Sequence, residues 1–431
     1  MTPHEIGRVL SQPIRIKHLA VANRLVMGPM AAHVPDKDGG ATAQTAAFFE
    51  ARARGGVGMI IAGGIIATPR SYEEAPFKTA LRLDLDKVVP SFRRVADAVH
   101  AHGVPIIAEI MPGFGRMGIP GPGRPIISAS PINVVIPEDR FPKGIRVPGG
   151  RTTPMPMEAS VAEIEQYERE MVDAAERAHR ANWDGVEVAA HMSYFAASFL
   201  SPRTNWRTDQ YGGSLENRAR LLVNVVTGIR RRISSDFVVG LRITANDYMP
   251  DGQGPKGFAA LAKQVELAGI DYVALSAGCY ETMNMSAPGV DGGLIDSGDA
   301  FVFKKMLSVP VLLQGLHDPA RAAQAVADGH GDMVMLARPL LADPNYARKV
   351  AEGRPNTIIR CNRDNHCIRR LMFNMPVRCT MNSEMGRESR RFKRLPPPKR
   401  LVQGAIESLI LRATGSARLM SVIGPLMKKF G

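Results

Sequence analysis

Short apolar runs alternate with longer amphipathic stretches from residue 24 to residue 340. The amphipathic stretches, such as residues 160–181 and 217–232, carry apolar residues three or four positions apart with charged residues between them, which is the pattern of a surface helix. The apolar runs span three to six residues and predict buried strands. The eight predicted strands are residues 24–27, 59–62, 104–109, 185–188, 237–242, 272–275, 311–313 and 333–336.

Strands that are apolar along their length and separated by helices indicate a parallel sheet covered by helices. Eight strand–helix units in succession predict an α/β fold of the closed (β/α)8 type, a TIM barrel with a short C-terminal extension. A doubly wound sheet is the alternative, and the lack of a G-x-G-x-x-G motif after the first predicted strand disfavours it. In a barrel, functional residues lie at the carboxyl ends of the strands.

The same patterns divide the chain into three segments. Residues 1–345 form the predicted barrel, residues 346–394 carry a cluster of cysteines, and residues 395–431 are a basic amphipathic tail. The tail begins with Leu-Pro-Pro-Pro, which no helix can traverse. Within the barrel, residues 143–156 are rich in Gly, Pro and Arg and are too long for an ordinary strand-to-helix turn. We expect them to form a lid over the barrel mouth.

The net charge of +14 is concentrated at the C-terminus. Residues 387–431 contain eleven Lys or Arg and two Glu, a net of +9, which leaves +5 for the rest of the chain. A nearly balanced body argues against nucleic-acid binding, whereas the tail suits a membrane surface, an acidic partner or an acidic substrate, or serves as a solubilising extension. No apolar run approaches the roughly 20 residues of a membrane helix, so we expect a cytoplasmic protein, peripheral to a membrane at most.

One long motif resembles a known family. Residues 205–218 read NWRTDQYGGSLENR, and the preceding GVEV at 185–188 and FLSP at 199–202 keep its spacing. These segments resemble the old yellow enzyme, or NADH:flavin oxidoreductase, superfamily. Among its members, the barrel domain of 2,4-dienoyl-CoA reductases and trimethylamine dehydrogenase-like proteins is the most similar. The resemblance implies bound FMN, with NAD(P)H as the electron donor.

Matches to the family fall at the predicted strand ends and imply contacts to FMN. Pro29, Met30 and Ala31 follow the first strand, where the family brings its backbone to the flavin. Gly63 ends the second strand, where a larger side chain would crowd the planar ring. Arg242 ends an apolar strand, and in the family the matching arginine lies against the flavin N1 and O2 edge, where reduced flavin gathers negative charge.

The last two strands match the family's phosphate site, and the third strand departs from the family. The resemblance implies that Gln314, Gly315, Ala337 and Arg338 bind the FMN phosphate through amides and a guanidinium. Glu109 stands where relatives usually carry a glutamine that binds the flavin pyrimidine. A carboxylate there disfavours flavin reduction unless it is protonated or paired with an arginine.

The proton donor also departs from the family pattern. Many relatives carry a His-x-x-His or His-x-x-Asn pair after the fourth strand, but Ala189 and Met192 occupy those positions here. His191, between them, is interpreted as a core histidine facing the barrel wall. Tyr194 matches the tyrosine proton donor of dienoyl-CoA reductases, and Tyr280 falls near their second catalytic residue, so both are predicted to be catalytic.

Three cysteines, Cys361, Cys367 and Cys379, lie within nineteen positions after the barrel. Relatives hold a [4Fe-4S] cluster there by C-x2-C-x3-C-x11-C, and only three of the four thiolates are present. The resemblance leaves two alternatives. Either Asp364 or His366 completes the ligand set and electrons arrive from a partner protein, or the cluster is lost and the segment only covers the barrel mouth.

Three functions remain open. The leading hypothesis is an FMN-dependent oxidoreductase that reduces an activated C=C bond of a small molecule, an enone or an enoyl thioester, by hydride transfer from flavin N5. The second is an oxidative N-demethylase or amine dehydrogenase, for which Trp183 and Trp206 offer little material for an aromatic cage. The third is a flavin-bearing scaffold whose tail docks a membrane or partner. A homo-oligomer is expected in each case.

Overall fold

The computed structural model describes residues 1–31, 34–76, 79–141, 151–286, 289–389, 402, 405–409 and 411. In this part of the chain, eight parallel strands close into a barrel in the order β10-β11-β12-β3-β4-β5-β8-β9. The strands are β3 (Leu25–Met27), β4 (Met59–Ile66), β5 (Ile106–Met111), β8 (Gly185–Ala190), β9 (Val238–Thr244), β10 (Tyr272–Ser276), β11 (Val311–Gln314) and β12 (Met333–Leu336). The predicted (β/α)8 barrel and its eight strands are confirmed.

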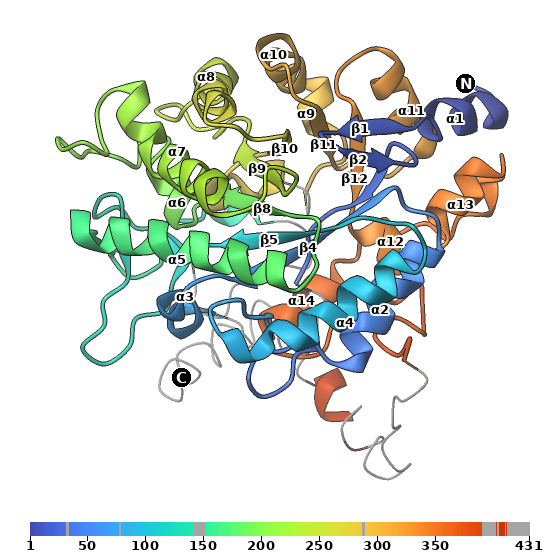
Figure 1. Ribbon diagram of the computed structural model, residues 1–431, viewed down its shortest axis with the longest axis horizontal. Coiled ribbons are helices and arrows are strands. Elements are labelled where there is room, and N and C mark those ends of the chain that lie inside the picture. The colour runs from blue at the N-terminus through green and yellow to red at the C-terminus, as the bar shows by residue number, and fades with distance from the viewer. Residues whose placement is uncertain are drawn as a thin grey trace.

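Helices surround the strands on the outside of the barrel (Figure 1). The N-terminal helix α1 (Pro3–Leu10) packs beside α11 and α13. In chain order the others are α2 (Ala43–Arg54), α3 (Pro69–Glu74), α4 (Val89–His100), α5 (Val161–Arg180), α6 (Phe195–Ser198), α7 (Leu215–Arg232), α8 (Pro255–Leu267), α9 (Gly293–Asp296), α10 (Asp299–Met306), α11 (Pro319–Ala327), α12 (Arg338–Ala342), α13 (Tyr346–Ala351) and α14 (His366–Met372).

Local signals in the sequence account for where the longest helices begin. Helix α5 starts at a capping box, in which Ser160 accepts from the Glu163 amide while the Glu163 side chain accepts from the Ser160 amide. Helix α7 starts at Ser214, whose side chain accepts from the Asn217 amide at the end of the family motif. The two caps therefore fix where the loops after β5 and β8 end.

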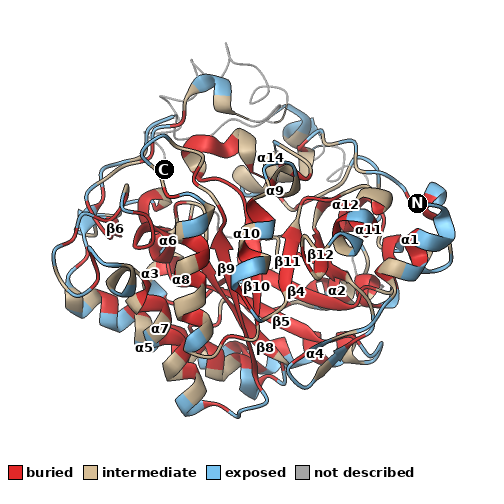
Figure 2. Cartoon of the chain, turned by 90° about the horizontal axis from the view of Figure 1, so that it is seen from above, coloured by how far each residue is buried: buried red, intermediate tan, exposed pale blue. Residues whose placement is uncertain are grey.

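An antiparallel hairpin closes the amino-terminal end of the barrel. Its strands are β1 (Ile14–Ile16) and β2 (Leu19–Val21). Ile16 and Val21 of the hairpin are fully buried against inward-facing residues of the barrel strands, so this end is a packed core and not a pore. Figure 2 shows that buried residues concentrate in the strands. The inward-facing residues are Val26, Met59, Ile61, Ile107, Val238, Tyr272, Ala274, Leu312, Met333 and Met335.

Loops and short elements cover the opposite, carboxyl-terminal end. They include β6 (Ile127–Ser128) paired with β7 (Met157–Glu158), and the 3-10 helices η2 (Gly115–Met117), η3 (Glu138–Arg140) and η4 (Tyr280–Met285). Of the predicted lid, residues 143–150 lie outside the described residues, as does most of the tail. Among the described residues, no helix is long and apolar enough to cross a membrane.

Candidate active site at the carboxyl end of the barrel

Arg242, near the end of β9, is held by residues of the next two strands. Its side chain is buried, its Nε donates to Ser276 Oγ (2.9 Å) and its Nη2 donates to Gln314 Oε1 (2.8 Å). The remaining nitrogen, Nη1, is buried and has no hydrogen-bond partner among the described residues. Leaving a buried charged donor unsatisfied is costly. The arginine is therefore placed to receive an acceptor that the described chain does not supply.

Glu109 on β5 faces Arg242 across the barrel mouth. Its Oε2 accepts a hydrogen bond from the Gly64 amide (3.0 Å), and its Oε1 lies 3.7 Å from Arg242 Nε. Burial raises the pKa of this carboxyl, and Arg242 and the Gly64 amide oppose the rise. The Oε1 atom makes no hydrogen bond to a described residue. The two side chains are therefore close, but Glu109 Oε1 and Arg242 Nη1 each lack a hydrogen-bond partner among the described residues.

The segment after β3 packs closely against a break in β4. The β4–β5 register shifts between Ala62 and Ile65, and Gly64 adopts φ 47°, a conformation that favours glycine. A Cβ atom at Gly63 would overlap both Pro29 and the Glu109 carboxylate. Gly63 therefore allows β4 to pack directly against Pro29 and the Glu109 carboxylate, and Gly64 supplies the left-handed backbone at the break. Met30 and Ala31 follow Pro29 in the chain, and Ala31 lies beside Gly64.

The residues predicted to bind a phosphate lie together at the ends of two neighbouring strands. Gly315 follows β11 with φ 82°, and Ala337 and Arg338 follow β12, which pairs with β11 in parallel. The Arg338 side chain is buried, and its Nη1 donates to Asn365 Oδ1 (2.8 Å). Asn365 belongs to the cysteine segment, so that segment helps to position Arg338.

Positive charge accumulates around Arg338. Arg363 lies nearby, with its Nη1 3.7 Å from Asp291 Oδ2. Burial, followed by the charges of Arg338 and Arg363, lowers the pKa of His317 to about 3. A site that keeps a histidine neutral and holds two guanidinium groups is suited to a dianion such as a phosphate monoester.

A cavity of about 200 Å³ lies beside Arg242 and contains both predicted catalytic tyrosines. The hydroxyls of Tyr194, after β8, and Tyr280, after β10, are 3.0 Å apart, and their rings meet edge to face with centroids 5.9 Å apart. The structure thus brings together two residues that are far apart in the sequence. The other residues that line the cavity are His191, Met192, Ser276, Met283, Ser286, Gln314, Ile368 and Met372.

His191 was interpreted from the sequence as facing the barrel wall, and this is wrong. It lines the cavity, because it continues the inward-facing alternation of Glu187 and Ala189 on β8. Its ring meets Tyr194 edge to face with centroids 5.4 Å apart. Burial and the charge of Arg242 lower the pKa of His191 well below its usual value, so the ring is neutral. Its Nδ1 is buried without a hydrogen-bond partner in the described part of the chain.

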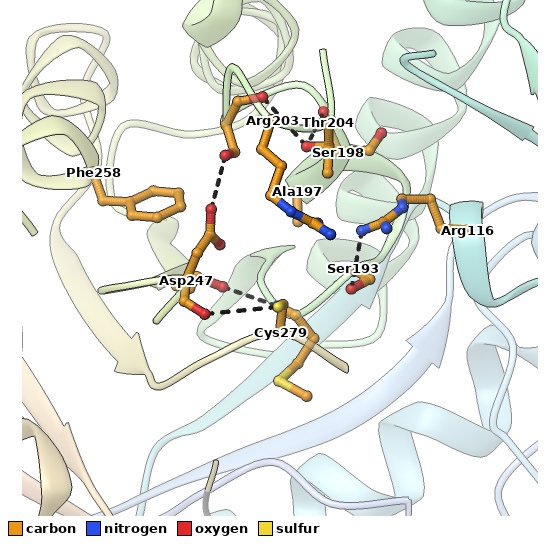
Figure 3. Close-up of a pocket in the computed structure, with 12 residues that line it drawn as sticks. Arg116, Ser193, Ala197, Ser198, Arg203, Thr204, Asp247, Phe258 and Cys279 are labelled. Carbon is orange, nitrogen blue, oxygen red and sulfur yellow. Dashed lines mark hydrogen bonds between the residues drawn. The ribbon is translucent and has the colours of Figure 1, made fainter. Parts of the chain in front are cut away.

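A buried ion-pair network fixes the loop that carries Tyr280. Glu281 pairs with Arg116 and with Arg203 (Nη1 to Oε1, 3.1 Å), and the Tyr280 amide donates to Ser193 Oγ (3.3 Å). Burial alone would raise the pKa of Glu281, but the two arginines outweigh it and hold the pKa below its usual value. Figure 3 shows Arg116, Arg203 and Ser193 around a cavity of about 10 Å³, room for one water.

The cysteine segment contributes directly to the cavity. Ile368 and Met372, on successive turns of α14, line it and pack with Met283 of η4. The patch also includes Val134 and Ile136 from the loop before the predicted lid. These apolar contacts could not be read from the sequence, because nothing in residues 366–372 marks the face that meets the barrel. The segment therefore covers the barrel mouth.

The predicted iron–sulfur ligands do not form a metal site in the described residues. No group of three or more His, Cys, Asp or Glu side chains in that part of the chain is placed to hold a metal ion. Cys361, Cys367 and Cys379 are free and partly buried, and burial raises the pKa of Cys367 to about 12, which disfavours the thiolate. The segment supplies only three of the four thiolates that a [4Fe-4S] cluster usually needs, and among the described residues neither Asp364 nor His366 joins them in a group placed to hold a metal.

Comparison with known proteins identifies the family of the chain. The sequence profile of the NADH:flavin oxidoreductase / NADH oxidase family matches residues 9–357. An NADH oxidase of Thermoanaerobacter brockii is 34% identical over 400 residues, 90% of this chain and 58% of the relative. A cinnamate reductase of Clostridium sporogenes is 30% identical over 406 residues, 88% of this chain and 58% of the relative. The structure of a 2-naphthoyl-CoA reductase complex superposes with a TM-score of 0.76 at 28% identity, covering 89% of this chain and 58% of that one.

The fold and the site therefore define a flavin-binding barrel of the oxidoreductase class. The chain belongs to the NADH:flavin oxidoreductase / NADH oxidase family, within the old yellow enzyme superfamily. It spans little more than half the length of the curated relatives it matches.

The residues on the carboxyl face fit FMN. The open Arg242 donor suits the N1 and O2 edge of the flavin, and the cationic end at Arg338 suits its phosphate. FMN and a nicotinamide electron donor are the cofactors of this family.

Proposed function

We propose that this chain reduces an activated carbon–carbon double bond through bound FMN. The observation that carries the proposal is the hydroxyl pair of Tyr194 and Tyr280, 3.0 Å apart in a largely apolar cavity that Arg242 borders. Bound FMN would supply two-electron transfer through its N5. Two of the matched relatives are named for the reduction of cinnamate and of 2-naphthoyl-CoA, both conjugated substrates, which supports the proposal.

Tyr194 is assigned as the proton donor. Reduction of an activated double bond requires a proton at the carbon next to the activating group. Burial raises the pKa of Tyr194 well above its usual value, and Tyr280 and Glu109 raise it further. Tyr194 is therefore protonated at neutral pH, and the hydroxyl of Tyr280 orients it. The ion pairs of Glu281 hold this second tyrosine in position.

His191 is assigned as a hydrogen-bond donor to the activating carbonyl oxygen of the substrate. Its neutral ring carries one N–H, it borders the cavity beside Tyr194, and its Nδ1 is unpartnered among the described residues. A donor at the carbonyl stabilises the negative charge that develops there as the double bond is reduced. His191 would thus take the role of the family's histidine pair, whose two positions are occupied here by Ala189 and Met192.

Oxidation of an amine is the second candidate, and the cavity favours it less. Recognition of an alkylated amine relies on several aromatic faces around the cation. Trp183 lies in the core, where its Nε1 donates to the Phe92 carbonyl, and Trp206 is 66% exposed. Neither lines the cavity, and the guanidinium of Arg242 beside it would repel a cation. An enone or an enoyl thioester is the better substrate class.

The finer assignments remain proposals. We propose direct reduction by NADH or NADPH in the barrel, with an electron-transfer protein as the alternative donor. The barrel (1–345), the cysteine segment (346–394) and the basic tail (395–431) are proposed as the three units of the chain. Contact of the tail with a membrane or acidic partner, and formation of a homo-oligomer, stay predictions.

Separate measurement of the two half-reactions tests the proposal. Under anaerobic stopped flow, we expect Tyr194→Phe to slow flavin reoxidation by a cyclic enone or enoyl thioester by roughly 10²- to 10⁴-fold. Flavin reduction by the nicotinamide should be unchanged. Tyr211→Phe is the matched control, because this buried tyrosine donates to Glu168 on the outside of the barrel. Equal slowing of both half-reactions by Tyr194→Phe would remove the tyrosine from the chemistry.

A further inference from the structure

Two buried carboxyl groups lie side by side on neighbouring barrel strands. Glu109 on β5 and Glu187 on β8 are direct register partners, so their side chains point to the same side of the two strands. Their exposed fractions are 4% and 0%. Carboxyl groups this deeply buried require a counter-charge or a proton.

One cation is available to the two acids within the described residues around them. Arg242 on β9 lies 3.7 Å from Glu109, and no ion pair joins it to Glu187. The Gly64 amide on β4 donates to Glu109 (3.0 Å). Neither oxygen of Glu187 makes a well-formed hydrogen bond to a described residue. The other titratable neighbours are neutral: the phenols of Tyr272 on β10 and of Tyr194 after β8, whose pKa values burial raises, and the His191 ring, whose pKa burial lowers.

The proton of this pair therefore belongs to Glu187 and the negative charge to Glu109. Burial, then the charge of Glu109, raises the pKa of Glu187 to about 8 against the opposing effect of Arg242. Burial also raises the pKa of Glu109, but Arg242 and the Gly64 amide favour its ionised form. With oxidised flavin, Arg242 thus faces one carboxylate. A second negative charge beside Arg242 would therefore have no counter-charge of its own.

We propose that the Glu109 carboxylate binds one proton from solvent each time the bound FMN is reduced and releases it on reoxidation. The balance is simple: the donor's two electrons and one proton go to the flavin as hydride, and a second proton goes to Glu109. Negative charge at the flavin N1 and O2 edge would then replace Glu109 as the counter-charge of Arg242, whose Nη1 has no partner among the described residues. The protonated carboxyl no longer opposes flavin reduction.

This inference rests on the FMN site and is independent of the substrate and of Tyr194. Its test is a spectroelectrochemical titration of the holoenzyme between about pH 6 and pH 8, with no substrate present. One proton per two electrons shifts the potential by about 30 mV per pH unit and two protons by about 59 mV. We expect the steeper slope for the natural protein. For Glu109→Gln we expect the shallower slope and a higher potential near pH 8.

The outcomes separate the possible proton acceptors. A shallow slope in the natural protein overturns the proposal. A steep slope that persists in Glu109→Gln also overturns it, because the flavin itself then takes the second proton. If Glu109→Gln does not retain FMN, proton uptake by the natural protein, measured with a pH indicator during photoreduction, replaces it. One proton per flavin contradicts the proposal, and two support it.

Infrared difference spectra identify the acid. Reduction should produce a new carboxylic-acid C=O band that Glu109→Gln lacks. Glu187→Gln is the matched control, because an acid that keeps its proton in both states contributes no gained band. We therefore expect this variant to retain the band. If the band were lost in Glu187→Gln and kept in Glu109→Gln, the proton would bind Glu187, and the assignment to Glu109 would be refuted.

Discussion

The two ends of the barrel are built from the same eight strands but satisfy their buried groups differently. At the amino-terminal end, Ile16 and Val21 of the hairpin pack on an apolar cluster and are fully buried. At the carboxyl end, Glu109 Oε1, Arg242 Nη1 and His191 Nδ1 are buried without hydrogen-bond partners among the described residues. Native cores rarely leave such groups unpaired. One end stabilises the fold, and the other is complete only with a ligand.

The change from an apolar interior to a polar one takes place within single strands. On β11, Leu312 belongs to the apolar cluster, whereas Gln314, two residues on, accepts a hydrogen bond from Arg242. Both side chains lie on the inward-facing side of the strand. Substitutions at the carboxyl end should therefore change cofactor binding, and substitutions at the amino-terminal end should change stability.

Removing the cation should have the largest effect. Arg242→Ala leaves the buried Glu109 carboxylate without its counter-charge and deletes the open donor at the flavin edge. Loss of one partner of a buried pair costs about 3–5 kcal/mol of stability, and loss of the charged donor should in addition weaken FMN binding by roughly 10- to 100-fold. Titration of the apoprotein with FMN, followed by flavin fluorescence, measures this. Affinity within about threefold of the natural protein would disprove the placement of the flavin edge.

Truncation at the packed end should act on stability alone. Leu312→Ala creates a cavity in the apolar cluster, where such changes typically cost about 2–5 kcal/mol. The free energy of unfolding should fall by about 3 kcal/mol, while the visible spectrum of the bound flavin stays the same. Urea unfolding and absorbance spectra check both. A changed flavin spectrum without loss of stability would erase the distinction between the two ends.

The pH dependence of stability should report Glu187. Its pKa, about 8 in the folded chain, is raised, so between about pH 4.5 and pH 8 the folded state holds a proton that the unfolded state has lost. Stability therefore falls as pH rises through that window. Glu187→Gln should remove a loss on the order of 2 kcal/mol between pH 6 and pH 8, since one pKa unit is about 1.4 kcal/mol. Unfolding of the apoprotein at both pH values measures it, and parallel losses in both proteins would contradict it.

The smallest effect is expected at α14. Met372→Ala shortens a cavity wall that the cysteine segment supplies. Loss of a few buried methylene contacts should raise the KM for an apolar enone about tenfold, with a smaller change in kcat. Steady-state kinetics with a cyclic enone measure the two constants. An unchanged KM would show that α14 does not bound the substrate.

The sequence could predict the parts that local patterns encode. Each apolar run became a strand, and Arg242, at the end of one of them, is buried at the carboxyl face as expected. The contact between Tyr194 and Tyr280 was not encoded in this way, because loops after two different strands must meet. His191 was misplaced although the alternation from Glu187 would have found it, since β8 was predicted to end three residues before it. The cavity wall on α14 left no periodic signal.

The most direct test of the central claim follows the visible spectrum of the purified protein under anaerobic conditions. Addition of NADH or NADPH should bleach the bands of a bound flavin. A stoichiometric amount of a cyclic enone or an enoyl thioester should then restore them, with formation of the saturated product. Bands that persist with both nicotinamides but bleach with a secondary or tertiary amine would contradict the account and make amine oxidation the function of this barrel.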